Sequence, residues 1–305
     1  MKYVASSIKG LEFITEKESS GKKICDTKIM YSSKKDLKSA FYSYQLFDHF
    51  KFKDLDDLVK KVKKLNIKFK GKFKINCIRT GKHKFSSYDV KCDVGELFEN
   101  GVDLTNPDFT LVIDIFDDYC FIGKNFVEYK RDYKIRSSPD SFSSVLAYCL
   151  LFVGKFTKTK KILDPICRDG IILLEAAENG CKNLYGLNED IKNAKINAKI
   201  KKYNLNLEPA ALDWIDTKFD ENFFDLILTK LPSVSKRKSE KIVFKVLEEF
   251  FYQVSYALKD KGDIVILVQD DKLVKEIIEK KKFKIKEEHS LELFAKFKIL
   301  RIKKY

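Results

Sequence analysis

The chain has 305 residues, 44% hydrophobic and 34% charged, which is the composition of a globular protein long enough for two or three domains. The 60 Lys and Arg outnumber the 45 Asp and Glu, and the net charge of +15 favours a polyanionic partner, nucleic acid first and a membrane surface second. An A+T-rich or heat-adapted genome also produces such lysine enrichment. The cysteines form no Cys-x-x-Cys pair and the histidines are isolated, so we expect reduced thiols, a cytoplasmic location, no metal and no membrane span.

Residues 1–68 are predicted to form a small α+β module. A strand at 3–8 precedes two amphipathic helices, at 34–50 and 54–65, which are assigned from apolar side chains at helical spacing. In the first of these helices the apolar side chains are Leu37, Phe41, Tyr44 and Phe47. We expect them to form core contacts rather than a platform for stacking bases.

Residues 69–127 contain a basic loop between a half-buried strand at 73–78 and a helix at 88–100. Two further strands are expected at 109–115 and 119–123. Side chains in such a loop are free to meet phosphates. The candidates are Arg79, Lys82, His83 and Lys84. On the residues alone, a merely solvated basic loop is an equally good interpretation.

Residues 128–139 are basic, aromatic and polar, and predict a linker to a Rossmann-like α/β domain over 140–305. A helix opening at 138 with Ser or Asp as its cap begins this region and runs to 154. The strands are expected at 161–164, 183–187, 208–212, 224–229, 263–268 and 283–288, with an edge hairpin at 292–302. The helices between them are expected at 171–178, 190–203, 240–258 and 272–281.

The clearest ligand-binding pattern is the tight loop 164–170, which reads Asp-Pro-Ile-Cys-Arg-Asp-Gly. It joins a short buried strand to a helix in which Glu175 and Glu178 are expected to flank the apolar face. A strand, a tight loop and a helix N-terminus form the ligand-binding corner of an open α/β sheet.

This corner resembles the first motif of the class I, adenosylmethionine-dependent RNA methyltransferases that carry a THUMP domain. That family writes Asp-Pro-x-Cys-Gly-Ser-Gly, then an apolar helix ending in Glu-Ala-Ala. The loop residues kept here are Asp164, Pro165, Cys167 and Gly170. Arg168 replaces the first family glycine, whose missing Cβ lets the methionine part of the cofactor lie on bare backbone. The resemblance implies a seven-stranded sheet with a reversed last strand, preceded by an α+β region of ferredoxin-like and THUMP type.

The region 69–127 resembles the THUMP domain itself, which writes Arg-x-Gly-Lys-His-x-Phe-Ser-Ser, a Gly-containing helix and Val-Asp-Leu-x-Asn-Pro-Asp. The resemblance implies RNA binding, in this family recognition of the tRNA acceptor end. The linker follows the family's Lys-Arg-x-Tyr-Arg pattern and adds Lys130 and Arg131 to the expected RNA-binding residues.

Further cofactor positions follow from the same resemblance. Ser141 falls beside the methionine end of S-adenosyl-L-methionine, and Asp213 matches the acid that holds the adenine amine. Trp214 then either walls the adenine or belongs to the core. Asn188 aligns with the acid that accepts both ribose hydroxyls, and an amide gives up that charge-assisted pair. Glu189 or Asp190 could substitute, although Asp190 is more simply a helix cap.

The catalytic motif of the family is Asn or Asp, Pro, Pro, aromatic, at the end of the fourth strand. Its oxygens accept hydrogen bonds from the target amine, and its ring stacks on the base. The aligned residues are Lys230, Leu231, Pro232 and Ser233. A lysine ammonium accepts no hydrogen bond, and serine has no ring face. The basic run 236–238 nearby is expected either to touch RNA or to be solvated.

The family resemblance thus implies a tRNA (guanine-N2) methyltransferase, and the altered residues leave three hypotheses open. The chain methylates an exocyclic guanine amine, or it is a catalytically inactive homologue that acts as a tRNA-binding or partner subunit. The third hypothesis is a different enzyme in which Lys230 serves as a base or an electrostatic clamp.

Overall fold

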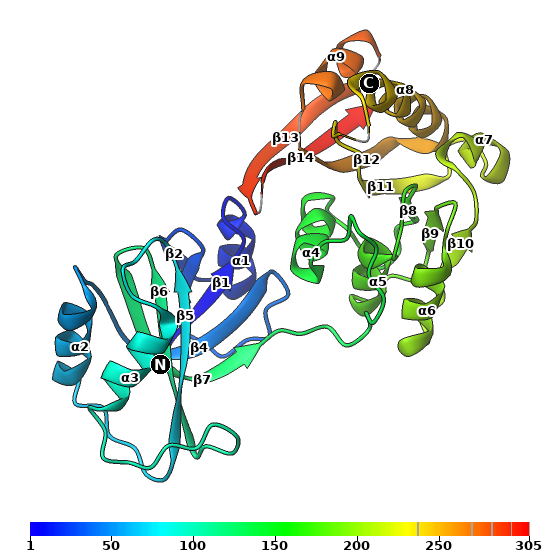
Figure 1. Cartoon of the computed structure of the whole chain (residues 1–305). Helices are drawn as coiled ribbons and strands as arrows, with labels where there is room; N and C mark the ends of the chain where they lie inside the picture. Colours follow the sequence, from blue (N-terminus) through cyan, green and yellow to red (C-terminus); the bar gives the residue numbers. More distant parts are fainter. Residues whose placement is uncertain (237, 270, 282, 294, 305) are drawn as a thin grey trace. The chain divides into compact units, whose positions relative to one another are not determined.

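The computed structural model describes residues 1–236, 238–269, 271–281, 283–293 and 295–304 (Figure 1). The chain divides into two compact units, one of Met1–Ser7 with Thr15–Tyr129 and one of Ile8–Ile14 with Lys130–Tyr305. Within the described ranges, every helix is too short or too polar to cross a membrane.

The N-terminal unit is built on a seven-stranded sheet in the order β2-β3-β1-β4-β7-β6-β5. All neighbouring strands are antiparallel except β5 and β6, which are parallel. The strands are β1 Lys2–Ser7, β2 Lys22–Cys25, β3 Lys28–Tyr31, β4 Ala40–Lys51, β5 Phe73–Thr80, β6 Phe109–Phe116 and β7 Tyr119–Glu128. The helices are α1 Glu12–Ser19, which spans the division between the units, α2 Leu55–Lys64 and α3 Ser87–Gly95. The expected strand at 3–8 and helix at 54–65 are confirmed as β1 and α2.

The helix expected at 34–50 is wrong, because most of this segment forms the long strand β4 between β1 and β7. Tyr42 and Tyr44 show the reason. They lie two residues apart, and both hydroxyls donate to Asp114 Oδ2, at 3.1 and 3.0 Å, as side chains on one face of a strand can. The same oxygen accepts a bond from Lys28 Nζ at 2.6 Å. Partners distant in sequence therefore override the helical spacing.

The C-terminal unit contains a second seven-stranded sheet, in the order β10-β9-β8-β11-β12-β14-β13. The strands are β8 Ile162–Asp164, β9 Leu184–Leu187, β10 Asn206–Glu208, β11 Phe224–Lys230, β12 Leu258–Val268, β13 Phe283–Glu292 and β14 Lys296–Lys304. The helices are α4 Ser144–Val153, α5 Ile171–Glu178, α6 Lys192–Ile200, α7 Ile215–Lys218, α8 Glu240–Ala257 and α9 Lys272–Lys280, with a 3₁₀ turn at Leu212–Trp214. The strands from β10 to β12 are parallel, and β14 runs antiparallel to both β12 and β13.

This topology positions the candidate site, because β8 and β11 are parallel neighbours whose carboxyl ends lie at the same edge of the sheet. Asp164 ends β8 and Lys230 ends β11. The family motifs separated by more than sixty residues in the sequence therefore meet in space.

Four expected boundaries need correction. The strand expected at 208–212 lies earlier, as β10 Asn206–Glu208, and a 3₁₀ turn begins at Leu212. The helix expected from 138 begins only at Ser144, where the Ser143 hydroxyl accepts the Leu146 N–H at 3.2 Å. The edge hairpin expected at 292–302 is larger, since it pairs all of β13 with β14. In the N-terminal unit, the helix expected at 88–100 ends at Gly95.

Candidate functional site

The loop after β8 keeps the backbone of a glycine-rich turn without the glycine. Arg168 has φ +51°, in the left-handed region that favours glycine, and Gly170 has φ +79° at the start of α5. The Cys167 N–H donates to the Leu187 carbonyl at 2.8 Å, which ties the loop to β9. Burial holds the pKa of the Cys167 thiol well above its usual range, and Pro165 is buried beside it. The loop conformation is therefore intact although its residues differ.

The Arg168 side chain crosses from this loop to the end of β11. Its guanidinium donates to the Lys230 carbonyl at 3.1 Å and to the Ile166 carbonyl at 3.4 Å. The guanidinium of Arg168 therefore occupies space that would be empty if residue 168 were the glycine of the family.

Asp164 lies beneath the loop, 2% exposed, and its Oδ1 accepts the Ile166 N–H at 3.2 Å. Burial raises the pKa of Asp164 to about 6, while the nearby Arg168 guanidinium opposes that rise. The pKa of Asp164 is therefore only slightly below neutral pH, so this carboxyl is ionised at pH 7 by a small margin.

Lys230 points into a cleft of about 360 Å³ at the end of β11. Its Nζ donates to the Asp140 carbonyl at 3.0 Å and lies 6.0 Å from the centre of the Phe297 ring. Burial, with a smaller contribution from Arg168, lowers the pKa of the Lys230 ammonium. Pro232 and Ser233 line the same cleft, whereas the buried Leu231 donates its N–H to the Leu267 carbonyl at 3.1 Å. The structure thus brings the expected catalytic residues together, but Lys230 is a hydrogen-bond donor and Pro232 is an apolar part of the lining.

The expected ribose and adenine positions follow β9 and β10. The Asn188 amide donates to the Asp190 carbonyl at 3.0 Å, so it is turned toward its own loop. Asp190 Oδ1 accepts the Lys192 N–H at 3.0 Å, but the N-cap of α6 is Ile191, so the expectation that Asp190 is the cap residue is wrong by one position. Asp213 is exposed in the 3₁₀ turn, and Trp214 is 54% exposed, so the interpretation of Trp214 as core is wrong.

Two buried polar residues that sequence reasoning missed organise the approach to the loop. Asp169, 1% exposed, accepts the Ser138 N–H at 3.2 Å and pairs with Lys134 at 3.1 Å. Lys134 also bonds the Ser141 hydroxyl. Asn197 on α6 accepts the Arg136 N–H at 2.9 Å and donates to the Asp169 carbonyl at 3.0 Å. The signal for Asn197 was a polar residue at an apolar position of its helix.

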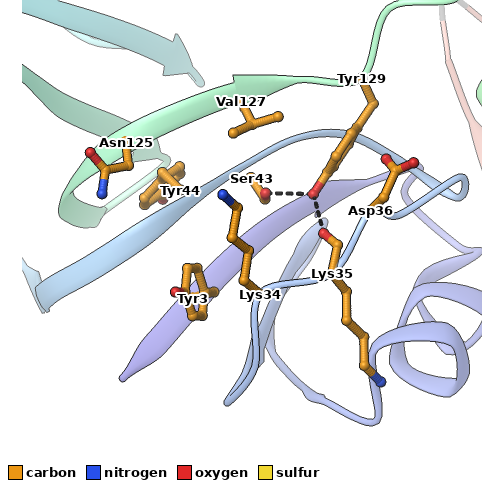
Figure 2. Close-up of a pocket in the computed structure, with 9 residues that line it drawn as sticks. All are labelled: Tyr3, Lys34, Lys35, Asp36, Ser43, Tyr44, Asn125, Val127 and Tyr129. Carbon is orange, nitrogen blue, oxygen red and sulfur yellow. Dashed lines mark hydrogen bonds between the residues drawn. The ribbon is translucent and has the colours of Figure 1, made fainter.

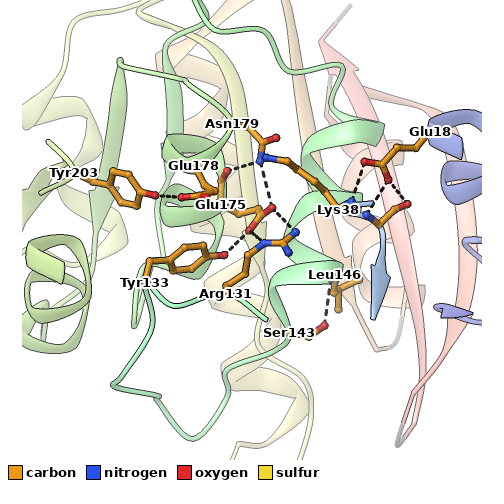
Figure 3. A network of polar contacts seen from close by, with 11 residues as sticks. Glu18, Lys38, Arg131, Tyr133, Ser143, Leu146, Glu175, Glu178, Asn179 and Tyr203 are labelled. Atoms are coloured by element: carbon orange, nitrogen blue, oxygen red, sulfur yellow. Dashed lines mark hydrogen bonds and ion pairs between the residues drawn. The ribbon is translucent and has the colours of Figure 1, made fainter. Parts of the chain in front are cut away.

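Glu175 is a third such residue, fully buried rather than flanking the apolar face of α5 (Figure 3). Arg131 grips its carboxylate with Nε at 3.1 Å and a terminal nitrogen at 3.2 Å, and the Tyr133 hydroxyl donates to it as well. The Arg131 side chain is only 11% exposed in this pair, so its guanidinium fastens the linker to α5. Lys130, just before it, is exposed.

In the N-terminal unit, the basic loop after β5 is held in place by His83 and by Arg79 near the end of β5, and it carries two exposed lysines. His83 contacts Arg79 across 3.0 Å and the Asp117 carbonyl across 2.8 Å, and its ring lies 5.0 Å from that of Phe85. Lys82 and Lys84 are exposed. The histidine therefore fixes the loop that displays the lysines.

The same unit has a hollow of about 550 Å³ over β1, β4 and β7, shown in Figure 2. Tyr3 and Tyr129 line it together with Lys34, whose side chain extends toward Ser43 and Tyr44. The Tyr129 hydroxyl is fixed between Ser43 Oγ at 2.6 Å and the Lys35 carbonyl at 2.9 Å.

The residues of the C-terminal unit fit S-adenosyl-L-methionine only in part. Asp164 and Gly170 have the expected placement, but Arg168 adds a cation between the loop and the end of β11, and a cation is unfavourable for a positively charged sulfonium nearby. Asn188 offers no charge at the ribose position. The loop backbone therefore fits this cofactor, whereas the cation at Arg168 and the uncharged Asn188 do not.

A mostly parallel seven-stranded sheet with one reversed strand, β14, between β12 and the edge strand β13, and with this loop after β8, defines a methyltransferase fold of class I. The chain belongs to the family described as RMKL-like, methyltransferase domain, whose family model matches residues 131–296, and a THUMP domain matches residues 51–124.

The relatives agree with this assignment. The chain is 24% identical to a tRNA (guanine(6)-N2)-methyltransferase of Methanocaldococcus jannaschii, over 78% of each protein. It is 27% identical to the bovine tRNA (guanine(6)-N(2))-methyltransferase THUMP3 over 66% of this chain, which spans 44% of that longer protein. The crystal structure of TrmN from Thermus thermophilus has the same fold, with a TM-score of 0.81 at 19% identity, and covers 100% of this chain and 99% of its own.

Proposed function

We propose that this protein binds tRNA and does not transfer a methyl group. The observation that carries the proposal is a pair of cations at the end of β11, where Lys230 replaces the catalytic acceptor of the family and the Arg168 guanidinium bonds the Lys230 carbonyl. The named activity of the relatives and the THUMP domain support the tRNA partner.

The chemistry of amine methylation explains why these residues matter. A guanine exocyclic amine needs hydrogen-bond acceptors that draw its protons away while the methyl group arrives. The Lys230 ammonium is a donor already turned toward the Asp140 carbonyl at 3.0 Å. Ser233 offers no ring on which the base would stack. The aligned side chains therefore offer neither the amide or carboxylate acceptor of the family motif nor its aromatic ring.

The tRNA-binding part of the proposal rests on the THUMP loop. Lys82 and Lys84 are exposed on a loop that Arg79 and His83 hold in place. Exposed lysines on a fixed loop contact phosphates without paying the full entropy of ordering the loop. We place the acceptor end of tRNA there, in keeping with the family.

The test is a single-turnover assay with labelled S-adenosyl-L-methionine, full-length protein in excess and unmodified tRNA. We expect tRNA binding in a parallel anisotropy titration and no label in the RNA. Transfer of label to a guanine would overturn the proposal. If transfer appears only after cell extract is added, the chain acts as a partner subunit of an active enzyme, and the proposal for the isolated chain stands.

A further inference from the structure

The cleft at the end of β11 has an excess of positive charge that the family chemistry does not use. Three cations line it, Arg168, Lys230 and Lys238, and one acid, Asp140. Among the described residues, none of these three cations forms an ion pair with a carboxylate. The cleft therefore has three cations against one acid, Asp140, in a partly enclosed space.

We propose that this cleft binds the phosphate group of a nucleotide. Arginine and lysine side chains that converge from different elements are the usual means of holding a phosphate dianion. Here Arg168 comes from the loop after β8, Lys230 from the end of β11 and Lys238 from the segment before α8. A cleft of about 360 Å³ is also large enough for a small ligand.

The hydrogen-bonding capacity of the cations supports this ligand. A guanidinium has five N–H donors, and Arg168 directs two nitrogens at the Ile166 and Lys230 carbonyls, so further donors remain. Lys230 gives one donor to the Asp140 carbonyl and keeps two. Because carbonyls and not carboxylates hold these side chains, they are oriented without losing their charge.

The mutual repulsion of the cations points the same way. Burial lowers the pKa of Lys230, and Arg168 adds to that lowering while Asp140 opposes it, so the two cations lie close enough to repel each other. A bound phosphate would remove that repulsion and hold both cations charged. Pro232, Val234 and Phe297 also line the cleft, and these apolar side chains would accept the less polar part of a nucleotide.

The inference rests on the proposed function, because it assumes that the cleft binds a nucleotide phosphate in a protein that does not use S-adenosylmethionine. The experiment is calorimetric titration of the full chain with inorganic phosphate at constant ionic strength, with chloride as the reference anion. We expect millimolar or tighter binding. Arg168→Gly and Lys230→Gln should each weaken it about tenfold, the loss of one charge-assisted contact.

Lys245→Ala is the matched control, because Lys245 is an exposed lysine of α8 outside the cleft. It should leave phosphate affinity within about twofold. Equal losses in Lys245→Ala and Lys230→Gln would mean non-specific attraction to a basic protein and would overturn the inference, as would no binding above the chloride reference. Circular dichroism of each variant checks folding, and either cleft variant alone suffices for the comparison.

Two further arms identify the source of the phosphate. AMP competing with inorganic phosphate where adenosine does not indicates a free nucleotide. A short acceptor-stem RNA that competes only with its terminal phosphate indicates RNA. A titration with S-adenosylmethionine separates the two proposals. Binding of S-adenosylmethionine would contradict the proposed function. If neither S-adenosylmethionine nor phosphate binds, the phosphate site alone is contradicted.

Discussion

At the scale of single residues, the chain keeps the shape of the family loop while changing its charge. Arg168 accepts a left-handed backbone, which costs a non-glycine residue about 1 kcal/mol, and its carbonyl contacts help to offset that cost. As a result, the buried carboxylate of Asp164 lies near the Arg168 guanidinium, where the family has a glycine without a side chain. The electrostatics of the loop can be tested through this acid.

The pH dependence of stability should carry the signature of Asp164. Its pKa is about 6 in the folded protein against an ordinary value of 3.8, so the folded state holds the proton more tightly. Its contribution is therefore most favourable below about pH 4 and is lost as the pH rises to about 6 and beyond, by roughly 3 kcal/mol. Asp164→Asn removes this loss.

Urea unfolding of the wild type and of Asp164→Asn at a series of pH values measures the effect. The free energy of unfolding of the variant should gain on that of the wild type between pH 4 and pH 6 and hold the gain above. Parallel curves for the two proteins would show that Asp164 titrates normally.

At the scale of elements, the linker is held to α5 through a buried carboxylate. Glu175→Ala would leave the Arg131 guanidinium and the Tyr133 hydroxyl without their common partner in an interior position. Removing one member of a buried ion pair costs about 3–5 kcal/mol, and we expect that loss in the free energy of unfolding.

The matched control is Glu178→Ala, which removes the other glutamate of α5, three residues after Glu175. Glu178 bonds Tyr203 near the surface, so its loss should cost less than about 1 kcal/mol. Chemical unfolding followed by circular dichroism compares the two variants. Similar losses in both would show that Glu175 is no more important to the linker than a surface acid.

The comparison of expectation and structure is clearest at this scale. The strand, loop and helix at 162–178 and the strand β11 were predictable, because short apolar runs beside motif residues leave few alternatives. The strand β4 was not, because Phe41, Tyr44 and Phe47 fit a helical period while their partners lie on β1 and β7.

The candidate site divides in the same way. Lys230 and Arg168 could be named from their alignment with the family motifs. The bond from Lys230 to the Asp140 carbonyl and the bond from Arg168 to the Lys230 carbonyl depend on three-dimensional contacts. Asp169, Glu175 and Asn197 were missed because each is a polar residue whose burial is decided by a distant segment, the linker. Local patterns do not report such pairings.

At the scale of the whole molecule, a net charge of +15 should make tRNA binding strongly dependent on salt. Replacing Lys82 and Lys84 together by alanine should weaken tRNA binding about tenfold or more and lower the slope of log affinity against log salt by about one per lost phosphate contact. Anisotropy titrations with labelled tRNA at several salt concentrations measure both quantities.

The control for this prediction is Lys241→Ala with Lys245→Ala, which removes the same charge from the exposed side of α8. Its affinity should stay within about twofold of the wild type. An equal loss in both double variants would assign tRNA binding to overall charge rather than to the THUMP loop.

The central claim is that the cations at the end of β11 exclude the methyl donor. Calorimetric titration of the full chain with S-adenosyl-L-methionine and S-adenosyl-L-homocysteine tests it most directly. We predict no binding of the first at millimolar concentration, and at least about tenfold tighter binding by Arg168→Gly combined with Lys230→Asn, which removes two like charges from the path of the sulfonium. Micromolar binding of S-adenosyl-L-methionine by the wild-type chain would contradict the claim and return the protein to the active methyltransferases.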